Sequence, residues 1–100
     1  MARYKVNDDE LTAALADLPS WEVKEGKLHK TYKFDSFAQA MGWMMSVAIN
    51  ADKMDHHPEW SNVYNKVQVN LVTHDLGNAI SNLDIDLAKK MEALANSQSG

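Results

Sequence analysis

The chain has 100 residues, no cysteine and a formal net charge of −4 at pH 7. This length suits a single domain, and without cysteine the chain has neither disulfides nor thiolate chemistry. The ten basic residues are spread thinly, so no basic stripe for nucleic acid is visible, and no apolar run reaches the ~18–20 residues of a membrane span. The start of the chain also lacks the apolar segment of a signal peptide. We therefore predict one cytoplasmic domain over residues 1–100, which contacts neither nucleic acid nor membrane.

A short helix and a hairpin are predicted first. Asn7 and Glu10 have the spacing of a capping box, which predicts a helix over about residues 8–17. Two strands, at 21–24 and 28–34, follow on either side of a tight turn.

The middle helix, predicted over Ser36 to Lys53, is apolar on nearly all sides. One stripe recurs with the helical period and is predicted to face the core: Phe37, Met41, Met44, Val47, Ala48 and Ala51. Four more apolar residues lie off the centre of this stripe: Trp43, Met45, Ile49 and Met54. Scattered apolar residues are normal on a surface, but the polar face of this helix is unusually narrow. We therefore predict that the helix is buried between its own sheet and a partner subunit.

A second hairpin and a final helix complete the prediction. A short strand near 61–64 and a longer strand over 67–73 flank a turn, and alternation gives the longer strand one buried face. A final helix begins near Ser81, and residues 96–100 are predicted to form a frayed tail. The order α-β-β-α-β-β-α with short hairpins predicts an α+β fold: a four-stranded antiparallel sheet with three helices packed on one face.

Three of the four histidines lie in two segments next to strands. His56 and His57 follow the middle helix, and His74 stands at the end of the last strand. Imidazole has an ordinary pKa near ~6.5, so at neutral pH it both donates and accepts protons. Pro58 favours an extended conformation at His57, which would point the two neighbouring side chains to opposite sides. His29, within a strand, is predicted to be a surface residue.

The residues alone leave other roles open for these side chains. An adjacent histidine pair can cap the C-terminus of a helix, where a cation is favoured. The three histidines, with Asp52 or Asp55, also have donor atoms suited to a metal ion. Their spacing has no closed ligand pattern, however, so no metal site is predicted. Trp60 can either form a flat apolar wall beside a heterocycle or belong to the core.

A longer pattern surrounds these histidines. The chain carries Asp52-Lys53-Met54-Asp55-His56-His57-Pro58-Glu59-Trp60, then Asn62-Val63-Tyr64-Asn65-Lys66-Val67, and later Thr73-His74-Asp75. An acidic residue four positions before His-His-Pro, an aromatic residue after it and a distant histidine at a strand end make a specific combination. The pattern closely resembles the signature of the pterin-4a-carbinolamine dehydratases, and the likeness extends over nearly the whole chain.

The resemblance implies a site for a hydroxylated tetrahydropterin. In this family the first histidine of the pair and the histidine at the strand end act as acid and base, and His56 and His74 occupy those positions. His57 matches the histidine that mainly holds the pterin, so the implied catalytic set is His56, His57 and His74. The implied substrate contacts are His56, His57, Pro58, Thr73, His74, Asp75 and Leu76, and Trp60, as the apolar wall, completes the predicted set. Asp52 and Asp84 would support them, and the family uses neither a metal nor a bound organic cofactor.

The segment between His74 and Asp84 departs from the family pattern. It is one residue longer than in the animal members, which changes the loop before Asp84. Ser81 and Asp84 also have the spacing of a capping box. Asp84 is therefore expected to cap the last helix, to support the site, or to do both.

The resemblance implies a lyase that dehydrates 4a-hydroxytetrahydrobiopterin, or a related pterin, to the quinonoid dihydropterin and so serves an aromatic amino acid hydroxylase. It also implies self-association through the middle helix into tetramers, with dimers as the alternative. Animal members additionally act as a dimerisation cofactor of a homeodomain transcription factor, so a protein-binding module is the rival function. A pterin-binding protein of molybdopterin metabolism is a third. The retained histidines favour the enzyme, because a scaffold does not need them.

Overall fold

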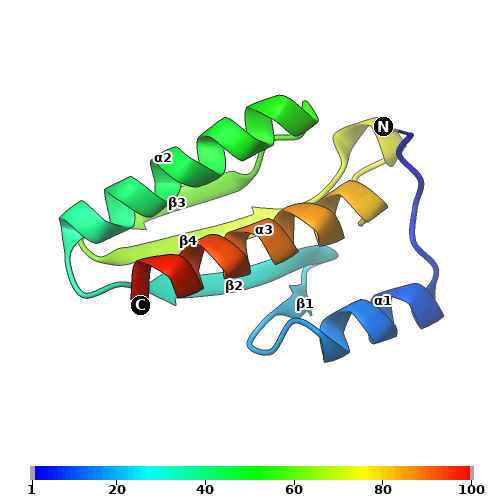
Figure 1. The fold of residues 1–100 in the computed structure, drawn as a ribbon. Coiled ribbons are helices and arrows are strands. Elements are labelled where there is room, and N and C mark those ends of the chain that lie inside the picture. Colours follow the sequence, from blue (N-terminus) through cyan, green and yellow to red (C-terminus); the bar gives the residue numbers. More distant parts are fainter. Residues whose placement is uncertain (1, 100) are drawn as a thin grey trace.

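The structure is a computed structural model that describes residues 2–99. Within this range the elements follow the predicted order: α1 (Asp8–Ala16), β1 (Glu22–Lys24), β2 (Lys27–Lys33), α2 (Phe37–Met54), β3 (Glu59–Val63), β4 (Lys66–Leu71), the 3-10 helix η1 (His74–Leu76) and α3 (Asn82–Ser99). The strands form one antiparallel sheet in the order β1-β2-β4-β3. Figure 1 shows α2 and α3 side by side over one face of this sheet. The predicted α+β architecture is confirmed.

The register gives the sheet two different faces. On the helix-covered face Leu28 is opposite Leu71 and Trp60 is opposite Val69, and the two leucines and Val69 are fully buried. The other face, here called the open face, carries polar side chains, because side chains alternate along a strand. Three of them, from adjacent strands, lie in one row: His29, Asn70 and Glu59.

The prediction that His29 is a surface residue was wrong. Only 7% of its surface is exposed, and its Nδ1 lies 2.9 Å from Oδ1 of Asn70. His29 belongs to β2, which has β1 on one side and β4 on the other. Alternation places a residue on the polar face but does not show which side chains of neighbouring strands lie beside it, here Asn70 of β4.

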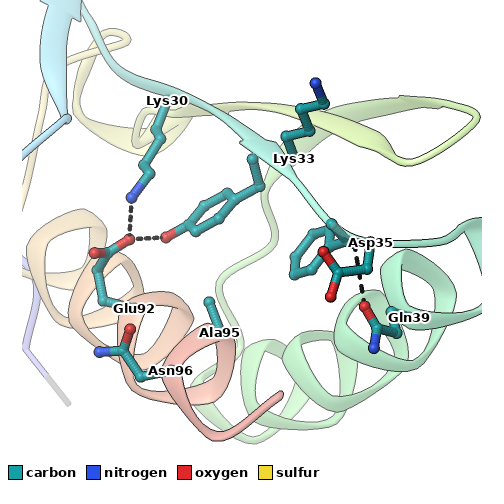
Figure 2. A pocket seen from close by; sticks show the side chains of 9 residues that line it. Lys30, Lys33, Asp35, Gln39, Glu92, Ala95 and Asn96 are labelled. Carbon is teal, nitrogen blue, oxygen red and sulfur yellow. Dashed lines mark hydrogen bonds and ion pairs between the residues drawn. The ribbon is translucent and has the colours of Figure 1, made fainter. Parts of the chain in front are cut away.

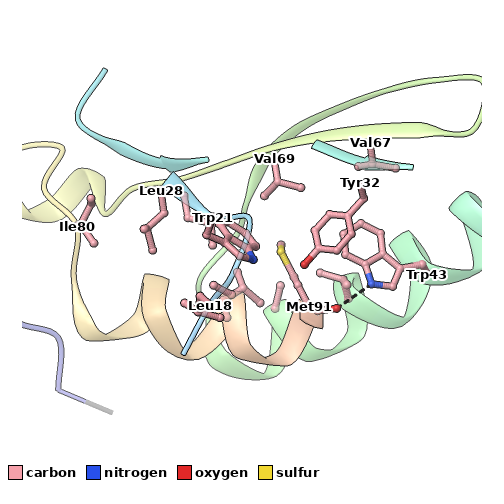
Figure 3. Close-up of a cluster of buried hydrophobic side chains, with 14 of the residues drawn as sticks. Leu18, Trp21, Leu28, Tyr32, Trp43, Val67, Val69, Ile80 and Met91 are labelled. Carbon is pink, nitrogen blue, oxygen red and sulfur yellow. Dashed lines mark hydrogen bonds between the residues drawn. The ribbon is translucent and has the colours of Figure 1, made fainter. Parts of the chain in front are cut away.

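Trp43 is fully buried in the core. Its indole Nε1–H donates to the carbonyl oxygen of Met91 at 3.1 Å, which ties α2 to α3 (Figure 3). The rings of Tyr32 and Phe34 pack against it, with centroids 4.4 Å and 5.1 Å away. The buried stripe of α2 consists of Ala40, Trp43, Val47 and Ala51. The predicted stripe is therefore corrected by a rotation of the helix: Trp43 faces inward and Phe37 is 56% exposed.

Two boundaries differ from the predicted ones. β3 begins at Glu59 rather than near 61, so Glu59 and Trp60 belong to the sheet. α3 continues through Ser99, so the tail predicted to be frayed over 96–100 is helical as far as the structure describes it. Gly100 lies outside the described residues. None of the helices within residues 2–99 has the length and apolar character needed to cross a bilayer.

One carboxylate joins α3 to β2 and to Trp21. Oε2 of Glu92 accepts a hydrogen bond from Nζ of Lys30 at 2.7 Å (Figure 2). The same oxygen also accepts from the hydroxyl of Tyr32 and from Nε1 of Trp21, the latter at 3.2 Å. Burial raises the pKa of the Tyr32 hydroxyl, and the neighbouring Glu92 carboxylate raises the same pKa further. The hydroxyl therefore remains a hydrogen-bond donor. Burial by itself would raise the pKa of Glu92. The hydrogen bonds from Lys30, Tyr32 and Trp21 outweigh that effect and hold this pKa below its ordinary value.

Replacing Glu92 with Gln should lower the free energy of unfolding at pH 7 by about 1–3 kcal/mol, because a neutral amide is a weaker acceptor for three donors. The pKa of the Glu92 carboxyl is lower in the folded than in the unfolded state. Its contribution is therefore present above the unfolded pKa of about 4.3 and is lost as the pH falls through the folded pKa. Urea unfolding across the acid range measures both effects. Glu25→Gln, an exposed residue in the β1–β2 turn, is the control. Identical pH profiles of stability for wild type and Glu92→Gln would contradict this account.

Candidate active site

A cavity of about 380 Å³ opens at one end of the sheet, where α2 ends and β4 leads into η1. Figure 1 shows that the N-terminal segment also reaches this end of the molecule. Three separate segments supply the lining: Arg3, Asp55, His56, His57, Pro58, Glu59, Val72, Thr73, His74 and Asp75. All three histidines of the predicted site are among them. Among residues 2–99, no three His, Asp or Glu side chains converge in an arrangement that would hold a metal ion.

The two histidines that follow α2 differ sharply in burial. Asp55 caps the helix in the left-handed conformation, with φ 52°, and the N–H of His56 still donates to the carbonyl of Ala51 at 3.1 Å. The chain leaves the helix abruptly as a result, and Pro58 prevents its continuation. The side chain of His56 is 6% exposed and that of His57 is 64% exposed. This difference in burial is what the opposite orientation expected from Pro58 would produce.

Asp84 is fully buried behind the cavity and contacts His56. Its Oδ1 lies 2.5 Å from Nε2 of His56, and its Oδ2 accepts from the hydroxyl of Thr73 and from the N–H of Ser81, both at 2.8 Å. Oγ of Ser81 is 2.6 Å from Oγ1 of Thr73. Because the Thr73 hydroxyl donates to Asp84, the Ser81 hydroxyl donates to Thr73. Asp84 thus caps α3 and contacts His56 with the same carboxylate.

His74 has a carboxylate partner of a different kind. It begins η1 directly after the buried Thr73, and its own side chain is 67% exposed. Its Nε2 lies 2.9 Å from Oε2 of Glu59, whose Oε1 lies 2.7 Å from Nζ of Lys27. Hydrogen bonds from Lys27 and then from His74 hold the pKa of Glu59 below its ordinary value. Glu59 is therefore an anion near neutral pH and an acceptor for both partners.

Comparison with known proteins shows what this chain resembles. Residues 4–94 match the family model described as pterin 4 alpha carbinolamine dehydratase. The chain belongs to this family. A protein of Jannaschia sp., provisionally named as a pterin-4-alpha-carbinolamine dehydratase, is 52% identical over 95 residues, which cover 91% of this chain and 96% of that protein. A protein of Solibacter usitatus with the same provisional name is 46% identical over 91% of this chain and 95% of its own length.

A solved structure agrees with the sequence comparisons. The crystal structure of a transcriptional coactivator/pterin dehydratase from Brucella melitensis matches this fold with a TM-score of 0.86 and 40% sequence identity. The match covers 92% of this chain and 99% of that one. Fold and sequence therefore assign the chain to the same pterin dehydratase family.

The cavity contains most of the residues that the family resemblance singles out, namely His56, His57, Pro58, Thr73, His74 and Asp75. Leu76 does not line it, and neither does Trp60. Trp60 lies on the helix-covered face, where its ring centroid is 6.2 Å from that of Trp43 and it packs against the core. This placement favours the core role over the flat wall beside a heterocycle. Asp52 is exposed, and its Oδ1 is 3.8 Å from Nε2 of His57, too far for a hydrogen bond.

Sequence reasoning did not single out Arg3 or Glu59. The guanidinium of Arg3 bonds Asp75 at 2.8 Å and the carbonyl oxygen of Asp55 at 3.5 Å, so it spans the two histidine segments. No local pattern indicates this, because Arg3 and Asp75 are 72 positions apart. Glu59 stands inside the family motif. If the predicted strand had begun at Glu59, two residues earlier, alternation with the inward-facing Trp60 would have predicted Glu59 on the open face.

Replacing Asp84 with Asn should lower the free energy of unfolding by about 1–3 kcal/mol, because an amide has one acceptor oxygen where the carboxylate serves three donors. Urea denaturation at pH 7 measures the change. Asp86→Asn is the matched control, since Asp86 is exposed two residues later in α3, and its effect should stay below about 0.5 kcal/mol. Equal stabilities of the two variants would show that the buried network contributes little.

Proposed function

We propose that this protein is a hydro-lyase that removes water from a 4a-hydroxytetrahydropterin, such as 4a-hydroxytetrahydrobiopterin, and releases the quinonoid dihydropterin. Family membership supports the substrate class. The observation that carries the chemistry is the presence of His56 and His74 on one cavity, each with a carboxylate at its Nε2. The proposed role of the reaction is to return the pterin to an aromatic amino acid hydroxylase.

The proposed elimination needs a donor for the departing hydroxyl group and an acceptor for the proton lost from a ring nitrogen. A neutral imidazole whose Nε2–H is bonded to a carboxylate has its lone pair on Nδ1, where it accepts a proton. A protonated imidazole presents Nδ1–H, which donates one. His56 and His74 can therefore fill the two roles in one turnover, one gaining a proton and the other losing one. Exchange with solvent then restores both.

His57 is assigned to holding the pterin. Its side chain lines the cavity and is mostly exposed, and Asp52 lies beyond hydrogen-bond distance from its Nε2. A ring nitrogen of His57 is thus available to a polar atom of the substrate. A hydrogen bond of this kind, made equally in the ground and transition states, contributes to KM rather than to kcat.

We propose in addition that α2 forms a contact between subunits, giving tetramers, with dimers as the alternative. Three large apolar side chains on this helix are mostly exposed: Phe37 at 56%, Met45 at 66% and Ile49 at 53%. Burying such side chains against a partner is favourable. The Brucella relative is described as a transcriptional coactivator as well as a dehydratase, so binding of another protein through the same helix is the second candidate function.

The three histidines should give distinct kinetic signatures. His56→Ala and His74→Ala should each lower kcat by roughly 10²-fold or somewhat less, the typical contribution of one acid/base group. His57→Ala should raise KM with little change in kcat. Turnover of freshly made 4a-hydroxytetrahydropterin, followed in the ultraviolet against the spontaneous rate and in the presence of a chelator, measures these constants.

A histidine outside the cavity provides the control for that series. His29→Gln should keep wild-type kinetics per folded molecule, since His29 contacts Asn70 and does not line the cavity. Circular dichroism checks the fold of every variant. Near-wild-type kcat/KM in a folded His56→Ala, His74→Ala double variant would show that the site lies elsewhere. Activity that is lost in chelator and restored by a divalent ion would favour metal chemistry instead.

Replacing Met45 with Glu should lower the molecular mass measured by light scattering while the circular dichroism spectrum stays unchanged. The reason is that a charge on the outer side of α2 opposes burial against a partner but faces solvent in a free subunit. Asp52→Glu, which keeps the charge of an exposed residue on the same helix, is the control for assembly and should keep the wild-type mass. A wild-type protein that is monomeric at micromolar concentration would contradict the proposed assembly.

A further inference from the structure

Three side chains from different elements form a hydrogen-bonded line at the cavity. Lys27 begins β2, Glu59 begins β3 and His74 follows β4, the strand that lies between the other two. Nζ of Lys27 is 2.7 Å from Oε1 of Glu59, and Oε2 of Glu59 is 2.9 Å from Nε2 of His74. Glu59 and His74 both line the cavity. The line therefore connects a lysine at the start of β2 to a histidine of the proposed site.

Because His74 is exposed, the orientation of its ring depends on the hydrogen bonds between Lys27 and Glu59 and between Glu59 and His74. The side chain of His74 is 67% exposed, so packing does not fix its ring, whereas the side chain of His56 is only 6% exposed. Glu59 is only partly covered by its neighbours, with 36% of its side chain exposed, so hydrogen bonds contribute to its position. Lys27 holds the second oxygen of this carboxylate, which limits the positions that the first oxygen can take.

The chemistry of the three groups fixes the direction of each hydrogen bond. A lysine ammonium only donates, and an ionised carboxylate only accepts. Nε2 of His74 must therefore be the donor toward Glu59. Nδ1 is then the nitrogen that carries either the lone pair or the exchangeable proton of His74.

We infer that Glu59, braced by Lys27, is a positioning residue for His74: it fixes the tautomer with hydrogen on Nε2 and leaves Nδ1 for the substrate. This inference rests on the proposed function, in which His74 is an acid/base group. His56 has the same arrangement, with Nε2 on the Asp84 carboxylate. The two carboxylates differ in their support, because Asp84 is buried among hydroxyl and backbone donors and Glu59 depends on an ammonium group.

The variant Glu59→Gln tests the tautomer directly. Lys27 requires an acceptor, so the amide oxygen of the new side chain would face Lys27 and its NH₂ would face His74. A donor at that position favours the opposite tautomer, with hydrogen on Nδ1. ¹⁵N NMR of the His74 ring should report hydrogen on Nε2 in the wild type and on Nδ1 in the variant. Glu22→Gln removes the same charge from an exposed residue of β1 and should leave the spectrum of His74 unchanged.

Steady-state kinetics test the consequence for catalysis. Glu59→Gln should lower kcat by roughly 10-fold or more with little change in KM, because the substrate then meets the wrong tautomer. Adding Lys27→Met should restore part of kcat, since without the ammonium the amide can turn its oxygen toward His74. A residue that only stabilised the fold would not be rescued in this way.

The outcomes separate this inference from the proposed function. The same His74 tautomer in wild type and Glu59→Gln would overturn the inference, whatever the activity. An altered tautomer with unchanged kcat would overturn it as well. A wild-type protein that does not dehydrate the pterin would instead contradict the proposed function, and the NMR comparison would still decide whether Glu59 sets the tautomer.

Discussion

The buried carboxylate of Asp84 is the constraint on which the site depends. It has no contact with solvent, so its hydrogen bonds must come from the protein, and they come from Thr73 after β4, from Ser81 before α3 and from His56 after α2. An acceptor that is buried and loses a donor destabilises the fold. The hydrogen bonds that join these three segments are therefore the same ones that place His56. The proposed site is thus preorganised by the same hydrogen bonds that join these segments.

This arrangement also makes the position of Asp84 independent of the length of the segment that joins it to His74. Asp84 is placed by its own helix, three residues after Ser81, and not by the number of residues that precede Ser81. The loop itself is closed by the bridge between Thr73 and Ala79, with Gly77 and Asn78 at positive φ in the turn. A change in the length of this turn would therefore alter the loop and leave Asp84 beside His56.

Local patterns were sufficient for the parts of the structure that local interactions determine. The capping box at Asn7, the two hairpins and the order of elements could all be predicted, because each depends on residues a few positions apart. The three histidines could be predicted from the family motif, and the structure brings them to one cavity. Arg3 could not, because its role depends on segments that meet only in the folded chain. The burial of His29 could not be predicted either, because the sequence of one strand does not show which strands lie beside it in the sheet.

The rotation of α2 shows how a packing choice in the core determines the outer surface. Periodicity counts apolar residues but does not weigh their size, so it assigned Phe37 to the core and left Trp43 outside the stripe. An indole buries more area than a phenyl ring, and its N–H requires an acceptor when it is buried. The carbonyl of Met91 in α3 provides that acceptor, which turns Trp43 inward. With Trp43 inside, the 3.6-residue period leaves Met45 and Ile49 on the outer side. The inward position of Trp43, held by its hydrogen bond to the Met91 carbonyl, thus determines which apolar side chains of α2 form the surface proposed for subunit contact.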